Sequence, residues 1–213
     1  MNLKLIALAA LAACSFGAHA ALTTYAPWDA AYTANGLNGV LFDVNTGSGA
    51  TTAMGAHAYK NGVFLANDGV SQFYADGGTY AGPPAEPNRA NWSFDFGWNY
   101  GTCTTCSAWL GIDTDFDTGI AYTYAQVGTA AGPVAGVADP ESWNMMMSFL
   151  SPLGFNPNVA SHTSFRLEVR DGQSRTGSLL SASEITVNVP EPATLALAGL
   201  ALAGLAMTRR RRG

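Results

Sequence analysis

Basic residues are scarce in the central part of this 213-residue sequence. Residues 21–189 contain five of them against fourteen acidic residues, which gives a net charge of −9. The five are Lys60, Arg89, Arg166, Arg170 and Arg175. Nucleic acids and anionic lipid surfaces attract proteins through clusters of Lys and Arg. The sequence therefore predicts no nucleic-acid partner, and its acidic balance suits a soluble extracellular protein.

Motifs for catalysis are also lacking. After residue 20 the sequence has two histidines, His57 and His162, and no G-x-S-x-G segment that would indicate a serine triad. No glycine-rich loop stands between a strand pattern and a helix pattern, so a phosphate site is not indicated. Two of the fourteen carboxylates could converge as a glycosidase pair, but none sits in an evident cleft motif. We expect a non-enzymatic protein, with a secreted hydrolase as an alternative.

Helical periodicity is missing too. Between residues 37 and 189 no apolar repeat of period 3.6 lasts for three turns. Short alternating runs separated by Gly, Asn, Asp and Pro follow one another instead, which is typical of strands and turns. The sequence thus predicts an all-β chain in which residues 21–189 form one antiparallel β-sandwich or jelly roll.

The clearest strand pattern covers residues 91–100. Its alternate side chains are large aromatics: Trp92, Phe94, Phe96 and Trp98. Alternation places them on one face of a strand, which is typical of the core face of a sandwich. A sugar-stacking platform is the alternative. Trp109, Tyr122 and Tyr124 are open to the same two interpretations.

Further strands are expected at short intervals. They cover 37–44, 71–75, 107–112, 118–127, 142–150, 164–171 and 183–189. The segment Lys60-Asn61-Gly62 lies between two short apolar pieces of residues 56–65 and predicts a hairpin. Asn67-Asp68-Gly69 predicts a turn. Residues 45–50, 76–88 and 128–140 are expected to be loops.

Cysteine occurs as one pair after residue 20, Cys103 and Cys106. If the protein is exported, the oxidising compartment favours a disulfide that closes a tight loop between two strands. Free thiols, a redox pair and a metal site are the alternatives. A zinc site needs more ligands, and neither a second C-x-x-C nor a nearby histidine is present.

Three aspartates stand at alternate positions: Asp113, Asp115 and Asp117. Hard oxygen ligands at this spacing suit Ca²⁺, which is the one cofactor that the sequence suggests. The segment is not an EF-hand loop, because Gly119 comes one residue late and Tyr124 replaces the bidentate glutamate. The alternative is a polar hairpin turn whose aspartates face water and accept local backbone hydrogen bonds.

The first twenty residues have the pattern of a secretory signal, with an apolar run at 5–13 after a lysine. Small residues occupy the two positions that signal peptidase reads, Ala18 and Ala20, which predicts cleavage before Ala21. The segment 11–14 also fits a lipobox, in which Cys14 would be lipidated.

The last two dozen residues have three parts in a fixed order. Pro190, Glu191 and Pro192 come first, then the apolar run 195–207, then the four arginines 209–212. This order resembles the PEP-CTERM sorting signal. The alternative is a permanent membrane anchor, but residues 193–207 would rise only about 22 Å as a helix, against roughly 30 Å of hydrocarbon.

The resemblance implies several partners and a location. In PEP-CTERM proteins the tail is recognised by exosortase, an integral-membrane cysteine enzyme, after export by the Sec machinery. It implies a precursor held in the inner membrane of a Gram-negative bacterium, then release to the cell surface or medium near exopolysaccharide or biofilm. A non-enzymatic surface or matrix protein is the resulting expectation. A carbohydrate-binding module is an alternative, and ice binding ranks last because threonine is not regularly spaced.

Overall fold

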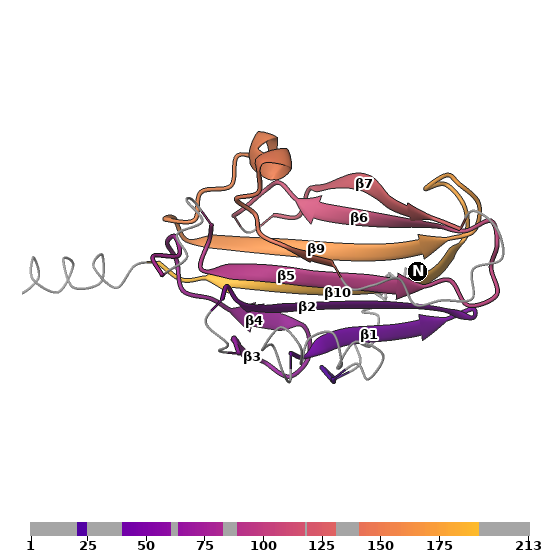
Figure 1. Cartoon of the computed structure of the whole chain (residues 1–213), viewed down its shortest axis with the longest axis horizontal. Coiled ribbons are helices and arrows are strands. Elements are labelled where there is room, and N and C mark those ends of the chain that lie inside the picture. The colour runs from indigo at the N-terminus through magenta and orange to yellow at the C-terminus, as the bar shows by residue number, and fades with distance from the viewer. Residues whose placement is uncertain are drawn as a thin grey trace, which may run out of the picture.

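The computed structural model describes residues 21–24, 40–60, 64–82, 89–117, 119–130 and 141–191. Their strands lie in two sheets that pack face to face, which confirms the all-β prediction (Figure 1). The strands are β1 Phe42–Gly47, β2 Ala50–Ala58, β3 Ala66–Asn67, β4 Gln72–Tyr74, β5 Trp92–Asn99, β6 Ser107–Asp113, β7 Tyr122–Thr129, β8 Glu141–Trp143, β9 Ser161–Arg170 and β10 Leu179–Val189. The predicted signal segment and C-terminal membrane helix lie outside the described residues.

The smaller sheet has the order β1-β2-β5-β8, and the larger one has the order β3-β4-β10-β9-β6-β7. Neighbouring strands are antiparallel except β4 and β10, which are parallel. The expectation of an antiparallel sandwich is therefore wrong for this pair. Parallel neighbours need a long crossover connection, and here the chain between β4 and β10 passes through both sheets.

The aromatic stripe of β5 lies in the core, as the core interpretation predicted. Its members are at most 7% exposed: Trp92, Phe94, Phe96 and Trp98. Phe94 stacks on Phe165 of β9 with ring centres 4.2 Å apart. Because β5 and β9 belong to different sheets, this contact joins the two layers. The alternate residues Phe165, Leu167 and Val169 of β9 are all fully buried, as their spacing predicted.

The interior is polar where β2 meets β10. Thr52 Oγ1 lies 2.9 Å from Ser181 Oγ and 2.8 Å from Ser183 Oγ, and all three hydroxyls are buried. The sheets come so close here that a Cβ on Gly47 would lie 2.5 Å from the Leu180 carbonyl oxygen. The buried Asp43 carboxylate also accepts a 2.8 Å hydrogen bond from the Glu184 amide. Hydrogen bonds thus connect the last strand to the first two.

The strand predicted at 142–150 is wrong beyond Trp143. The chain turns at Asn144 and forms the 3₁₀ helix Ser148–Leu153. The Asn144 side chain accepts hydrogen bonds from the Ala90 and Met146 amides, which stabilises the turn. Asparagine side chains compete in this way with regular strand pairing.

Two other predictions fail near the start of the domain. Residues 45–50 are not a loop, because β1 continues to Gly47 and only Ser48 and Gly49 make the turn to β2. The hairpin expected around Lys60 is also wrong, because β2 and β3 lie in different sheets. In contrast, the predicted turn at 67–69 is present, and β4 follows it. The predicted strands at 107–112, 118–127, 164–171 and 183–189 correspond to β6, β7, β9 and β10 with shifted ends.

Candidate functional site

Cys103 and Cys106 form a disulfide in the turn between β5 and β6. Cys106 is buried, whereas Cys103 is partly exposed. The preceding turn is held by the Asn99 side chain, which accepts a 2.7 Å hydrogen bond from the Gly101 amide. The disulfide therefore stabilises a tight connection between one sheet and the other, because β5 and β6 belong to different sheets.

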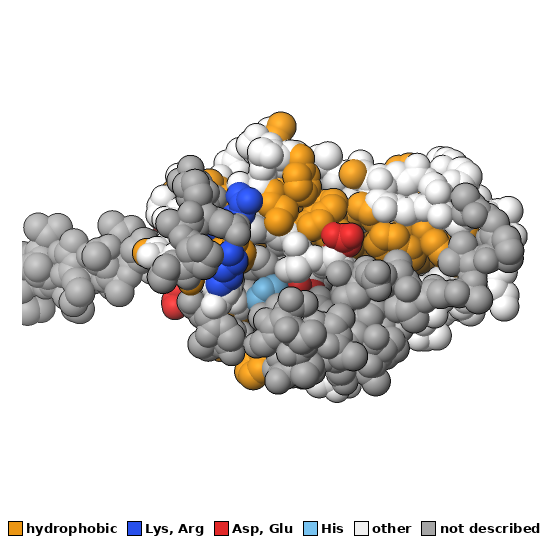
Figure 2. Space-filling view, viewed as in Figure 1, with side chains coloured by type: hydrophobic (Ala, Val, Ile, Leu, Met, Phe, Trp, Pro, Cys, Tyr) orange, Lys and Arg blue, Asp and Glu red, His pale blue; other side chains and the backbone are white. Residues whose placement is uncertain are grey.

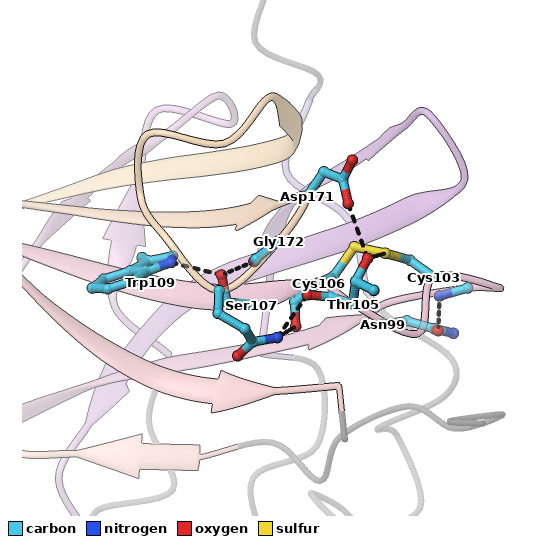
Figure 3. Close-up of a disulfide and its surroundings, with 10 residues drawn as sticks. Asn99, Cys103, Thr105, Cys106, Ser107, Trp109, Asp171 and Gly172 are labelled. Carbon is cyan, nitrogen blue, oxygen red and sulfur yellow. Dashed lines mark hydrogen bonds between the residues drawn. A yellow bond between two sulfur atoms is a disulfide. The ribbon is translucent and has the colours of Figure 1, made fainter. Parts of the chain in front are cut away.

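The disulfide turn contacts the loop between β9 and β10, as Figure 3 shows. Thr105 donates a 3.0 Å hydrogen bond to Asp171, and Gln173 Nε2 donates a 2.6 Å bond to the Thr105 carbonyl. Ser107 Oγ donates to the Gly172 carbonyl at 2.7 Å. In the part of the chain that the structure describes, Cys103, Cys106 and Asp171 are the one trio of metal-ligating side chains within 4.8 Å. Its two sulfurs are bonded to each other, so this trio offers no thiolates to a metal.

Asp113, Asp115 and Asp117 lie at the hairpin that joins β6 to β7. Asp113 is fully buried, and its Oδ1 accepts hydrogen bonds from the Asp115 amide (3.0 Å) and the Ala121 amide (2.7 Å). Asp115 and Asp117 are exposed. Their carboxylates do not gather with that of Asp113 into a second trio among the described residues. Asp113 and Asp115 accept backbone hydrogen bonds, as in the polar-turn alternative, but Asp113 does not face water as that alternative expected.

Three arginines surround one buried carboxylate on the outer face of the larger sheet. Glu168 of β9 is 2% exposed, and its oxygens lie 2.9 Å from Arg166 Nε, 2.6 Å from Arg170 Nε and 3.3 Å from Arg175 Nε. Arg166 also pairs with Glu184 of β10 at 2.8 Å. Burial alone would raise the pKa of Glu168, but the hydrogen bonds and charges of these arginines hold it below its ordinary value.

Aromatic side chains lie beside this charged network. Register places Trp109 opposite Glu168 and Tyr124 next to Gly111, which itself faces Arg166. The Tyr124 ring covers Gly111, where a Cβ would lie 2.6 Å from a ring carbon. The Arg175 guanidinium stacks on the same ring, 3.3 Å from its centre. Burial, followed by the charge of Glu184, raises the pKa of Tyr122. This face thus carries partly exposed rings next to paired charges.

A buried histidine–aspartate pair lies on the outer face of the smaller sheet. His57 Nδ1 of β2 is 2.6 Å from Asp95 Oδ2 of β5, and the residues are 4% and 0% exposed. Burial favours the neutral imidazole, but the charge and hydrogen bond of Asp95 raise the pKa of His57 above 6.5. Ser93 lies opposite His57 in the register, yet within the described chain no hydrogen bond joins the two. The pair thus has the geometry of the aspartate–histidine half of a triad, without a hydrogen-bonded serine among the described residues.

A pocket of about 360 Å³ opens where the last strand ends. Among its lining residues are Tyr74, Phe116, His162, Pro190 and Glu191. Pro190 and Glu191, the first two residues of the predicted sorting motif, are exposed. Pro192, Ala18 and Ala20 lie outside the described residues, and Ala21 is exposed. The described residues include no helix that is long and apolar enough to span a membrane.

The sequence anticipated some of these residues and missed others. It identified the disulfide pair and the Pro-Glu-Pro motif, and it named Trp109, Tyr122 and Tyr124 as ambiguous aromatics. It missed the arginine cluster around Glu168. The signal was present, because three of the five basic residues in residues 21–189 fall within residues 166–175. On the face of the molecule shown in Figure 2, few of the described side chains are charged.

Comparison with known proteins gives one match, at the C-terminus. The family model for the PEP-CTERM protein-sorting motif matches residues 188–212. No curated protein and no solved structure matches the chain. The tail therefore carries a PEP-CTERM motif, which implies an exported protein of a Gram-negative bacterium that exosortase sorts and processes.

Proposed function

We propose that this chain is a non-enzymatic protein of the cell surface or extracellular matrix, exported by the Sec machinery and released by exosortase near exopolysaccharide. The observation that carries the proposal is the position of the motif. β10 ends at Val189, and the motif begins at Pro190, so both described sheets lie on its N-terminal side. The whole sandwich would remain together when the tail is removed.

The polar clusters of the domain support a non-enzymatic role. Glu168 is surrounded by arginines, and the carboxylate of Asp113 accepts backbone amides. His57 is bonded to Asp95 through Nδ1, as in a triad, but within the described chain no hydrogen bond joins its ring to Ser93, the serine opposite it. These groups are engaged with one another in ways that stabilise a fold, and a hydrolase would need them directed into a cleft.

The test compares a producing strain with a strain that lacks its exosortase. In the first we expect the protein in the medium and in the exopolysaccharide fraction, without Arg212. In the second we expect the uncut chain in the inner membrane. Export that is unaltered by the deletion would contradict the sorting role. Release into the medium with no enrichment in the polysaccharide fraction would contradict the matrix role alone.

A carbohydrate-binding module is the second candidate, and the outer face of the larger sheet favours it. Trp109 is partly exposed there and lies opposite Glu168, which is paired with Arg166. Sugar rings stack on aromatic faces, and paired charges can donate to and accept from their hydroxyl groups. Glycan-array binding that is lost in Trp109→Ala would support this candidate. Phe149→Ala is the control, because Phe149 is 56% exposed and lies outside that sheet. An absence of binding across a broad array would count against the candidate.

A further inference from the structure

The outer face of the larger sheet carries a row of three different polar side chains at one end. Register places Tyr74 of β4 opposite Asn188 of β10, and Asn188 opposite His162 of β9. Their neighbours Phe73 and Val187 are buried in the core, so Tyr74 and Asn188 point to the outer face. Because adjacent strands lie about 4.8 Å apart, the row spans roughly 10 Å.

The loop after β6 adds a carboxylate to this row. The His162 amide donates a 2.9 Å hydrogen bond to the Phe116 carbonyl, which holds the loop beside β9. The Phe116 ring packs edge-on against Phe155, with ring centres 5.4 Å apart. Asp117, the next residue, is exposed. A phenol, an amide, an imidazole and a carboxylate thus line the pocket of about 360 Å³ at this end of the sheet.

These side chains have groups to offer a ligand. Within the described chain, the side chains of Tyr74, His162 and Asp117 make no hydrogen bond. The Asn188 Nδ2 group donates to Gln72 Oε1 at 3.2 Å and to the carbonyl of the next residue in β4 at 3.3 Å, so its Oδ1 is left as an acceptor. Tyr74 is 47% exposed, which leaves its ring open to contact from outside.

The arrangement does not suit a metal ion or an anion. A cation needs ligand atoms that converge on one point. Asp117, His162 and Glu191 all line the pocket, yet among the described residues they form no trio of ligand atoms within 4.8 Å of one another. No arginine or lysine of the described chain lines the pocket, so its two carboxylates would repel a negatively charged ligand.

An aromatic ring beside hydrogen-bonding groups suits a sugar. The apolar face of a sugar ring can stack on a phenol ring, and its hydroxyl groups can donate to carboxylate and amide oxygens. The pocket volume lies at the lower end of the range for small-molecule sites, roughly 300–1,000 Å³. Six residues of β9, or about 20 Å, separate His162 from Glu168, which lies opposite Trp109. The pocket is therefore distinct from the face around Trp109.

We infer that this pocket binds an uncharged sugar segment of a polysaccharide. The Tyr74 ring stacks on one sugar ring, and Asp117 and Asn188 Oδ1 accept hydrogen bonds from its hydroxyl groups. The His162 ring donates or accepts beside them. The inference rests on the proposed matrix function for its biological role, and it names the chemical class that such a protein would bind. Binding by the purified protein does not depend on how the tail is processed.

The test measures sugar binding directly. The full chain is purified in a detergent without sugar groups and titrated with tetrasaccharides by isothermal titration calorimetry. The neutral probes are tetramers of glucose, mannose and galactose, and the acidic probe is a tetramer of galacturonate. We expect at least one neutral tetramer to bind, and the galacturonate tetramer to bind more weakly than it. If no neutral tetramer binds, or if galacturonate binds equally well or better, the inference is overturned.

Substitutions locate the site. Tyr74→Ala and Asp117→Asn should each weaken binding by about 5- to 10-fold, with urea midpoints to show that the variants are folded. Asp115→Asn is the matched control and should bind like the wild type, because Asp115 is exposed in the same loop but does not line the pocket. An equal loss in Asp115→Asn, or a loss in Trp109→Ala without one in Tyr74→Ala, would overturn the assignment of this pocket. Binding as expected by a chain that is absent from the polysaccharide fraction would support the pocket and contradict the matrix function.

Discussion

Glu168 illustrates how much one residue depends on partners that are remote in sequence. The alternation of residues 164–171 predicts that it points away from the core with Arg166 and Arg170, and it does. The sequence does not show that the side chain is nearly inaccessible. One of the groups that surround it, Arg175, reaches it from the loop after β9 and stacks on Tyr124. A pattern of period two gives the face of a strand but not what a loop places over that face.

Replacing Glu168 with Gln should destabilise the domain. The change leaves three partly exposed arginines without the carboxylate that they share, and losing hydrogen bonds to a buried charge costs about 1.5–3 kcal/mol. Urea denaturation measures the loss. Glu184→Gln is the matched control, because the Glu184 side chain is 25% exposed and its ion pair among the described residues is with Arg166, so its loss should be about 1 kcal/mol or less. Equal effects of the two substitutions would contradict the central role of Glu168.

His57 should make stability depend on pH. Its pKa is raised by Asp95, so the folded state binds the proton more tightly than the unfolded state, whose pKa is near 6.5. The stabilisation is fully present below pH 6.5 and is lost as pH rises through the folded pKa. Urea midpoints measured from pH 5.5 to pH 9 should fall over that window in the wild type. In His57→Gln this fall should be absent, and an identical pH profile would refute the assignment.

Asn144 acts at the scale of an element, because it ends β8 and connects that edge to β5. Its amide nitrogen donates to the carbonyls of Ala90 (3.0 Å) and Trp92 (2.7 Å), and its oxygen accepts from the Ala90 amide. The alternating pattern of residues 142–150 resembles a strand. The pattern fails as a predictor because the Asn144 side chain forms hydrogen bonds with nearby backbone groups, and these bonds replace the pairing that a longer strand would make.

Asn144→Ala should cost roughly 2–4 kcal/mol, because it leaves several buried backbone groups at Ala90 and Trp92 without partners. Thermal and urea unfolding check this value. Asn158→Ala is the control, since Asn158 is exposed and its backbone amide, not its side chain, donates the hydrogen bond to Asn156. A loss at Asn158 as large as that at Asn144 would argue against the bridging role.

The disulfide in the turn between β5 and β6 stabilises the folded state mainly by lowering the entropy of the unfolded chain. Closing a loop of about four residues is expected to stabilise the folded state by about 2 kcal/mol. The double substitution Cys103→Ser and Cys106→Ser should lower the unfolding free energy by that amount, and dithiothreitol should do the same to the wild type. The double variant itself should not respond to the reductant. If dithiothreitol destabilised the double variant, or left the stability of the wild type unchanged, this account would be contradicted.

At the scale of the whole molecule, composition and alternation predicted the all-β class and the inward side of β5 and β9. They did not predict the assignment of strands to sheets. β2 and β3 are neighbours in sequence and carry a hairpin signal between them, yet they lie in different layers. Pairing between remote strands is decided by the fit of complete faces, such as Phe94 on Phe165 and Thr52 on the serines of β10. A short stretch of the sequence contains no information on contacts between strands that are remote from it.

The closing role of β10 gives a prediction for the whole domain. A chain of residues 21–191 should unfold in one cooperative transition, because β10 is complete and joins both layers. A chain of residues 21–186 lacks Val187 and Val189, and burial of two such side chains contributes roughly 3–6 kcal/mol. It also loses the pairing of Asn188 with β4 and β9. Calorimetry of the two chains should therefore show a much lower melting temperature, or no transition, for the shorter one. If both melted alike, β10 would not close the sandwich, and a cut upstream of the motif would carry no structural penalty.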